Sequence, residues 1–148
     1  MNRPPMQPPE NQPIGFWTVR AGEAIRNRTR SALEAVDVPQ PQWWVLHQLT
    51  LHPDGMDRTA MVKRIGPNDS DAVVSEAIDA ALAQGRASDD GERLHLTPTG
   101  RAAFDRAAAV QDELQQERMQ GITHEEFVTT IRVLQRTCEN VGADVWHW

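Results

Sequence analysis

The chain has 148 residues, a formal net charge of −6 and a single cysteine. This length suits one compact domain, and no apolar run approaches the roughly 18 residues of a membrane helix, so no membrane partner is expected. The first residues lack the apolar stretch of a secretory signal, and one cysteine cannot form an internal disulfide, so we expect a cytoplasmic protein. The acidic balance argues against a highly basic nucleic-acid coat protein, although a local basic patch can exist within an acidic total.

The N-terminal part of the chain divides into a tail and two predicted helices. Residues 1–13 contain five prolines, which predicts a disordered or extended tail before a single domain over 14–148. Apolar residues at helical spacing predict a first helix over about 15–36. After a proline-rich break, a second helix is expected over 41–49, and its apolar composition predicts burial on most sides.

The middle of the chain carries the signals of two short helices and a hairpin. Asp57 can cap a helix that ends near Ile65, and Ser70 can cap another that stops at Gly85. An alternating segment over 86–96 contains the turn residues Asp89-Asp90-Gly91-Glu92, which predicts a β-hairpin. Residues 40–97 therefore have the element order of a winged helix-turn-helix, a module that most often binds duplex DNA.

Two more helices are predicted after the hairpin. Thr97 and Pro98 open a helix that runs to about Met119, and Thr123 with Glu126 forms a capping box at the start of the last one. The expected fold class is mainly α with a small β-hairpin wing: a winged helix-turn-helix flanked by N- and C-terminal dimerisation helices.

The terminal helices, over 14–36 and within 98–148, are amphipathic, and the central module offers them little core to cover. A partner subunit is the simplest way to bury them, so we expect a homodimer; the alternative is that they fold onto their own domain. The C-terminal segment 146–148 is expected to pack on the partner; the alternatives are stacking with nucleic acid and binding of a stray metal. The residues expected at the interface are Phe16, Phe127, Ile131, Leu134, Cys138 and Val141.

Four segments carry a resemblance to a known family: Pro13-Ile14-Gly15-Phe16-Trp17, Gln42-Trp43-Trp44-Val45-Leu46, Leu96-Thr97-Pro98-Thr99-Gly100-Arg101 and residues 121–136. Together with the order of elements, they resemble the MarR family of bacterial transcriptional regulators, most closely a sub-group common in actinomycetes. The resemblance covers roughly residues 13–142. It implies a dimeric winged-helix repressor or activator, often released from DNA when a small phenolic or other ligand binds between the dimerisation helices and the DNA-binding lobe.

The charges of the recognition elements conflict with easy DNA binding. The predicted fourth helix and its start carry four acids and no Lys or Arg before Arg86, and the hairpin has only Arg86 and Arg93 as cations. One interpretation is a weak or highly sequence-selective binder of a palindromic operator. The alternative is a dimeric small-molecule-binding or protein-interaction module that has lost DNA binding. The residues expected to face DNA are Arg58, Lys63, Arg64, Ser70, Val74, Ser75, Arg86 and Arg93.

Tryptophans on the first two helices suggest a ligand pocket. Aromatic walls with a cation or an imidazole suit an aromatic carboxylate or a phenolate, although the same residues are also typical of a core. The candidate pocket residues are Trp17, Arg20, Trp43, Trp44 and His47.

Signals of catalysis are weak. The five histidines have no metal-ligand spacing with each other or with Cys138, and no glycine-rich phosphate loop or nucleophile elbow is present. We therefore expect no metal, no cofactor and no enzymatic activity.

Overall fold

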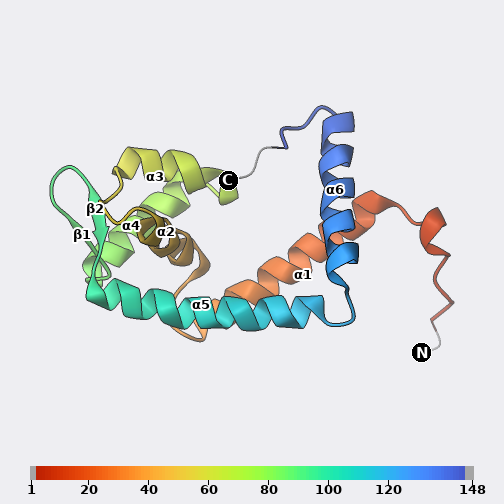
Figure 1. Ribbon diagram of the computed structural model, residues 1–148, viewed down its shortest axis with the longest axis horizontal. Helices are drawn as coiled ribbons and strands as arrows, with labels where there is room; N and C mark the ends of the chain where they lie inside the picture. Colours follow the sequence, from red (N-terminus) through yellow and green to blue (C-terminus); the bar gives the residue numbers. More distant parts are fainter. Residues whose placement is uncertain (1–2, 146–148) are drawn as a thin grey trace. The chain divides into compact units, whose positions relative to one another are not determined.

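The structure is a computed structural model that describes residues 3–145 (Figure 1). The chain divides after Gln111 into two compact units, which are described separately. The segment 146–148, which was expected to pack on a partner, lies outside the described residues. None of the described helices is both long enough and apolar enough to cross a membrane.

The first unit begins with an exposed segment and a long helix. Residues 3–13, where a disordered or extended tail is expected, contain one short 3-10 helix, η1 (Pro9–Asn11). Helix α1 (Ile14–Glu34) follows, and only Thr29 and Leu33 on it are buried. Most of α1 is therefore surface within this single chain.

Helix α2 (Gln40–Leu51) is the central helix of the first unit. Pro39 precedes it and Pro41 lies in its first turn, where the missing amide hydrogen costs no helical hydrogen bond. Its buried residues are Gln42, Val45, Leu46, Gln48 and Leu49, and only Leu51 is exposed, which confirms the expected burial on most sides.

The two helices that precede the wing in the sequence have the N-terminal caps that the sequence predicts. The Asp57 carboxylate accepts a hydrogen bond from Ala60 N at 2.9 Å and begins α3 (Arg58–Ile65). A 3-10 turn, η2 (Gly66–Asn68), leads to Ser70, whose hydroxyl accepts from Val73 N at 3.2 Å and begins α4 (Asp71–Ala83).

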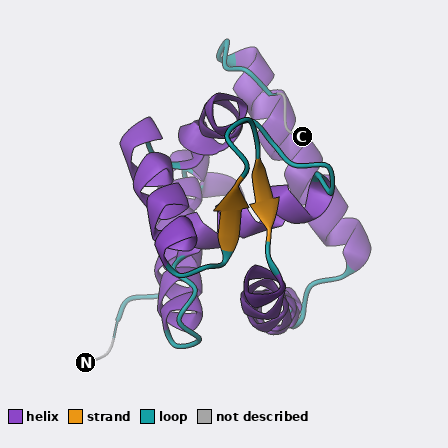
Figure 2. Cartoon of the chain, turned by 90° about the vertical axis from the view of Figure 1, so that its left-hand side faces the viewer, coloured by secondary structure: helices purple, strands orange, loops and turns teal. Residues whose placement is uncertain are grey.

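The wing is a short antiparallel hairpin (Figure 2). Strand β1 (Ala87–Asp89) pairs with β2 (Leu94–Leu96), with Ala87 opposite Leu96. Met56 adds a bridge to Leu94 through two backbone hydrogen bonds of 2.9 and 2.8 Å, which ties the segment before α3 to the wing. Helix α5 (Pro98–Met119) follows, and the Thr97 hydroxyl accepts from Gly100 N at 3.0 Å in its first turn.

Two apolar clusters hold the first unit together. The larger one joins α2, α3, α4 and the hairpin, and it includes Leu49, Ile65 and Ile78. The smaller one joins the end of α1 to α2 and α5 through Leu33, Leu46 and their neighbours. Because α2 contributes to both clusters, it fixes the winged module to the end of α1 and the start of α5.

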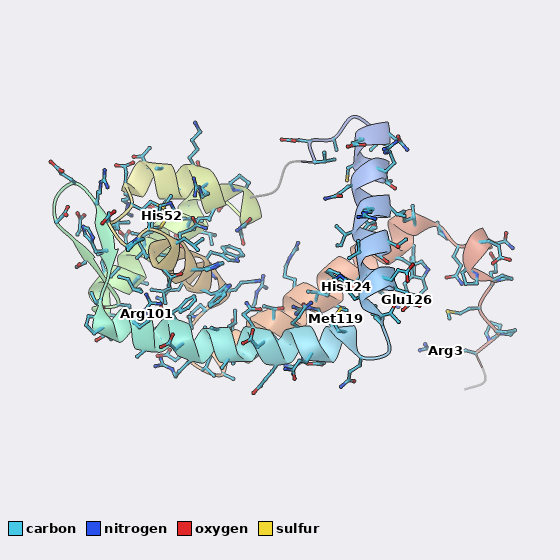
Figure 3. All side chains as sticks on the ribbon, in the orientation of Figure 1. Arg3, His52, Arg101, Met119, His124 and Glu126 are labelled. Carbon is cyan, nitrogen blue, oxygen red and sulfur yellow. The ribbon has the colours of Figure 1, made fainter. Side chains whose placement is uncertain are left out.

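The second unit contains the end of α5 and α6 (His124–Asn140). The predicted capping box is confirmed: the Thr123 hydroxyl accepts from Glu126 N at 3.1 Å, and the Glu126 carboxylate accepts from Thr123 N at 2.8 Å. Figure 3 shows His124 and Glu126 in the first turn of α6. No residue of α6 is buried, so its apolar seam is available to a partner.

Candidate nucleic-acid interface

Arg58 and Ser75, two of the expected DNA contacts, are bonded to each other across α3 and α4. Arg58 Nη2 donates to Ser75 Oγ at 2.9 Å and to Asp79 Oδ1 at 2.8 Å. The Arg58 side chain is 37 % exposed and that of Asp79 is 66 % exposed. Asp79 therefore neutralises much of the charge that Arg58 presents to solvent.

A groove of about 610 Å³ lies between α3 and the start of α4. Lys63 and Ser70 border it, while Asp69 and Asp71 place two carboxylates on the same rim. Arg64 is exposed on α3, as is Lys63. The groove thus contains a cation and a capped helix N-terminus, which suit a phosphate group. It also contains two carboxylates, which repel a phosphate group.

The prediction that Val74 faces DNA is wrong. Val74 is completely buried in the larger apolar cluster, because this position of α4 points toward α2 rather than to solvent. The exposed face of α4 instead carries Ala72, Glu76 and Asp79, with Val73 half-buried beside them. Glu76 was not among the residues predicted to face DNA. Its position in the helical period, opposite Val74 and Ile78, is the signal that could have placed it on the exposed face.

The wing turn is organised by Asp90. Its Oδ1 accepts from Arg93 N at 2.8 Å and from Glu92 N at 2.9 Å, and its Oδ2 lies 2.7 Å from His95 Nε2. These contacts, chiefly the two backbone hydrogen bonds, lower the pKa of Asp90 to about 2. Arg93 is exposed next to this turn, and its Nη1 donates to Asp54 O at 3.4 Å.

The prediction that Arg86 contacts DNA is also wrong. Only 8 % of its side chain is exposed, and its guanidinium forms an ion pair of 3.1 Å with Asp37 inside the first unit. The guanidinium has its hydrogen-bond acceptors within the fold, so Arg86 is a structural cation.

An aromatic stack joins α2 to α5. The Trp43 ring lies 5.1 Å from Phe104 at an interplanar angle of 6° and 5.3 Å from His47 at 17°. Arg101, labelled on α5 in Figure 3, places its guanidinium carbon 5.7 Å from the centre of the Phe104 ring. Burial lowers the pKa of His47, which favours its neutral form. Phe104 was not among the pocket residues predicted from the sequence.

The remaining candidate pocket residues lie elsewhere in the first unit. Trp44 packs against the larger apolar cluster, whereas Trp43 packs against the smaller one. Trp17 Nε1 donates to Gln12 Oε1 at 2.6 Å, and Arg20 lies 5.5 Å from the Phe16 ring centre. The residues expected to line one pocket therefore occupy three different surroundings, and Trp43 with His47 is the pair that the stack brings together.

Within residues 3–145, no cluster of three or more His, Cys, Asp or Glu side chains is placed to hold a metal ion.

No protein-family model matches the sequence, and a search of curated proteins gave no match. Solved structures do match. A MarR-family transcriptional regulator from Silicibacter pomeroyi has a TM-score of 0.72 at 15 % identity, over 86 % of this chain and 92 % of that one. A MarR-family transcriptional regulator from Rhodococcus sp. RHA1 has a TM-score of 0.70 at 20 % identity, over 82 % and 91 %. A MarR-family protein of Mycobacterium tuberculosis, solved in complex with DNA, has a TM-score of 0.66 at 20 % identity, over 90 % and 100 %.

The capped helix pair, the hairpin and the following long helix define a winged helix-turn-helix protein. More specifically, the chain has the fold of MarR-family transcriptional regulators over most of its length. The expected fold class and the family resemblance are thus confirmed at the level of the fold. The likeness to an actinomycete sub-group stays a prediction.

Proposed function

We propose that the protein is a transcriptional regulator that binds a palindromic operator in duplex DNA as a homodimer. The observation that carries this proposal is the likeness, over most of both chains, to MarR-family regulators, one of them solved in complex with DNA. Exposed Lys63 and Arg64 on α3 and exposed Arg93 on the wing supply cations for phosphates. A regulator that binds chromosomal DNA must be present in the same compartment as that DNA. This agrees with the cytoplasmic location expected from the sequence.

The acidic face of α4 favours selective over strong binding. Asp71, Glu76 and Asp79 repel phosphates and thereby reduce the electrostatic contribution that the exposed cations make to affinity. Base edges offer other contacts: a carboxylate such as that of Glu76 accepts from the amino group of cytosine, and the methyl group of Ala72 suits that of thymine. We therefore expect weak affinity for random DNA and a high ratio of specific to non-specific binding.

A dimer accounts for apolar surface that a single chain leaves exposed. On α6, Phe127 is 38 % exposed and Ile131 is 40 % exposed, and on α1, Phe16 is 51 % exposed. Leu134 and Cys138 are half-buried on the same α6 seam, and Val141 follows the helix. A twofold dimer presents two copies of α4, and their spacing then matches the half-sites of a palindrome.

Selection of bound fragments from the source genome tests this function. Affinity for the selected operator should fall steeply between about 50 and 200 mM salt, because each phosphate contact releases counterions. Arg93→Ala should weaken binding by about 1 kcal/mol, which is the low end for a charge-assisted contact. Failure to bind any fragment at about 50 mM salt refutes the proposal.

The acidity of α4 and the wing favours a second candidate: a dimeric small-molecule-binding or interaction module that does not bind DNA. In either function, the stack of Trp43, Phe104 and His47 beside Arg101 suits a small phenol or aromatic acid. Titration of tryptophan fluorescence with a panel of aromatic acids and phenols tests for an effector. Saturable quenching that Trp43→Leu abolishes, in a protein that binds no genomic fragment, supports the second candidate over the first.

A further inference from the structure

Arg86 lies where segments distant in the sequence meet. Its Nη1 donates to the backbone oxygen of Asp37 at 2.7 Å and to Oε1 of Gln42, while its Nη2 donates to Asp37 Oδ2 at 3.1 Å. Gln42 Nε2 in turn donates to Gln84 Oε1 at 3.0 Å. These bonds join the corner between α1 and α2, defined here as residues 35–42, to the C-terminal end of α4.

The corner has a strained residue that the guanidinium supports. Asp37 has a φ of 59°, a left-handed conformation that residues other than glycine seldom adopt. Its amide donates to Glu34 O at 3.0 Å, and Val38 N donates to Leu33 O at 3.1 Å, so Asp37 closes the last turn of α1. A cation at this end of α1 also interacts favourably with the helix dipole.

The backbone of Arg86 fixes the base of the wing. Its amide donates to Ala81 O at 2.8 Å, and its oxygen accepts from Thr97 N at 3.3 Å. A Cβ atom on Gly100 would lie only 1.8 Å from Arg86 O, so the start of α5 can approach here only as glycine. One residue therefore holds the end of α1 with its side chain, and α4, the hairpin and α5 with its backbone.

We propose that Arg86 is a positioning residue for DNA recognition, which sets the orientation of α4 and the wing relative to α1. The inference rests on the proposed function. In a dimer that uses α1, the two α4 helices must meet half-sites about 34 Å apart, and rotation at the corner would change this separation. A rigid corner therefore makes the dimer prefer operators with one half-site spacing. The planar guanidinium suits this role because its donors point in fixed directions, unlike those of a lysine ammonium group.

The first test measures binding to the selected operator and to versions with half-sites moved by one base pair. Arg86→Met removes the donors, Arg86→Lys keeps the charge, and Lys63→Met is the control for loss of an exposed cation. We expect both Arg86 variants to lose about tenfold in operator affinity, the size of one lost base contact, and to discriminate less between spacings. Their dependence on salt should match that of the wild type, because no phosphate contact is lost.

Lys63→Met should instead reduce the slope of log affinity against log salt by about 1.8 per dimer and leave the spacing preference intact. A similar fall in slope for Arg86→Met, or an unchanged spacing preference in a folded variant, overturns the proposal. Asp37→Gly removes the carboxylate acceptor and relieves the left-handed strain, so it remains informative where Arg86→Met does not fold. Asp37→Gly should reduce the discrimination between half-site spacings, as Arg86→Met does. An unchanged discrimination counts against the proposal.

Hydrogen exchange of the DNA-free protein separates this inference from the proposed function. Loss of the Arg86 side-chain contacts should speed amide hydrogen exchange at the corner, 35–42, and in the segment 84–97, which contains the wing and the residues on either side of it. Helix α3 should stay protected. Faster exchange in only one of the two segments refutes their coupling through Arg86. A wild-type protein that binds no DNA refutes the proposed function, and the exchange data still decide whether Arg86 couples the two segments.

Discussion

Removal of the Asp79 carboxylate should strengthen DNA binding by releasing the charge of Arg58. Asp79 accepts a hydrogen bond of 2.8 Å from Arg58, and both side chains are partly exposed. An exposed ion pair of this kind contributes at most about 1 kcal/mol to stability, and alanine has a higher helix propensity than aspartate. Asp79→Ala is therefore expected to fold normally and to present Arg58 as an additional cation.

The size of the effect follows from counterion release. Each newly neutralised phosphate steepens the slope of log affinity against log salt by about 0.9, or about 1.8 for the two protomers of a dimer. Over the fourfold change from about 50 to about 200 mM salt, this slope corresponds to a factor of about twelve. The ratio of the affinities at the two salt concentrations should thus be about twelvefold larger for Asp79→Ala than for the wild type.

Fluorescence anisotropy with a labelled operator measures this ratio. Glu23→Gln, which removes one exposed acid from α1, is the control for the change in net charge. It should leave the slope close to that of the wild type, since its carboxylate is neither on α4 nor paired with Arg58. An unchanged slope for folded Asp79→Ala refutes the reasoning, because Arg58 would then not reach a phosphate.

Other predictions concern stability, assembly and pH. Within the described residues, neither side-chain polar atom of the fully buried Gln48 has a hydrogen-bond partner, so Gln48→Met should raise the free energy of unfolding in urea by about 1–3 kcal/mol. A decrease would indicate a buried water that satisfies the amide. Leu134→Asp should convert dimers to monomers in light scattering, because it places a charge in the α6 seam, whereas the exposed control Gln135→Asp should remain dimeric. Burial lowers the pKa of His47 below 6.5, so the unfolded chain binds a proton at a higher pH than the folded chain does. The contribution of neutral His47 to the free energy of unfolding is therefore complete above pH 6.5 and declines as the pH falls below it. Between about pH 7.5 and 5.5 the wild type should therefore lose more stability than His47→Gln, and equal losses would contradict this assignment.

Local signals in the sequence determined the elements of the fold. Asp57, Ser70 and Thr123 cap the helices that they were expected to cap, and the alternating segment after Gly85 forms the hairpin. These signals are reliable here because a cap or a turn acts on backbone groups within a few residues of itself.

The tertiary structure decided which of the candidate side chains can reach a ligand. Arg86 meets Asp37, which is 49 residues away, and Arg58 meets Asp79, which is 21 residues away, so two expected phosphate contacts have partners inside the fold. The adjacent residues Trp43 and Trp44 belong to different apolar clusters, because successive positions of a helix point in different directions. Whether a charge is free, paired or buried depends on packing between helices, and short-range sequence patterns do not contain that information.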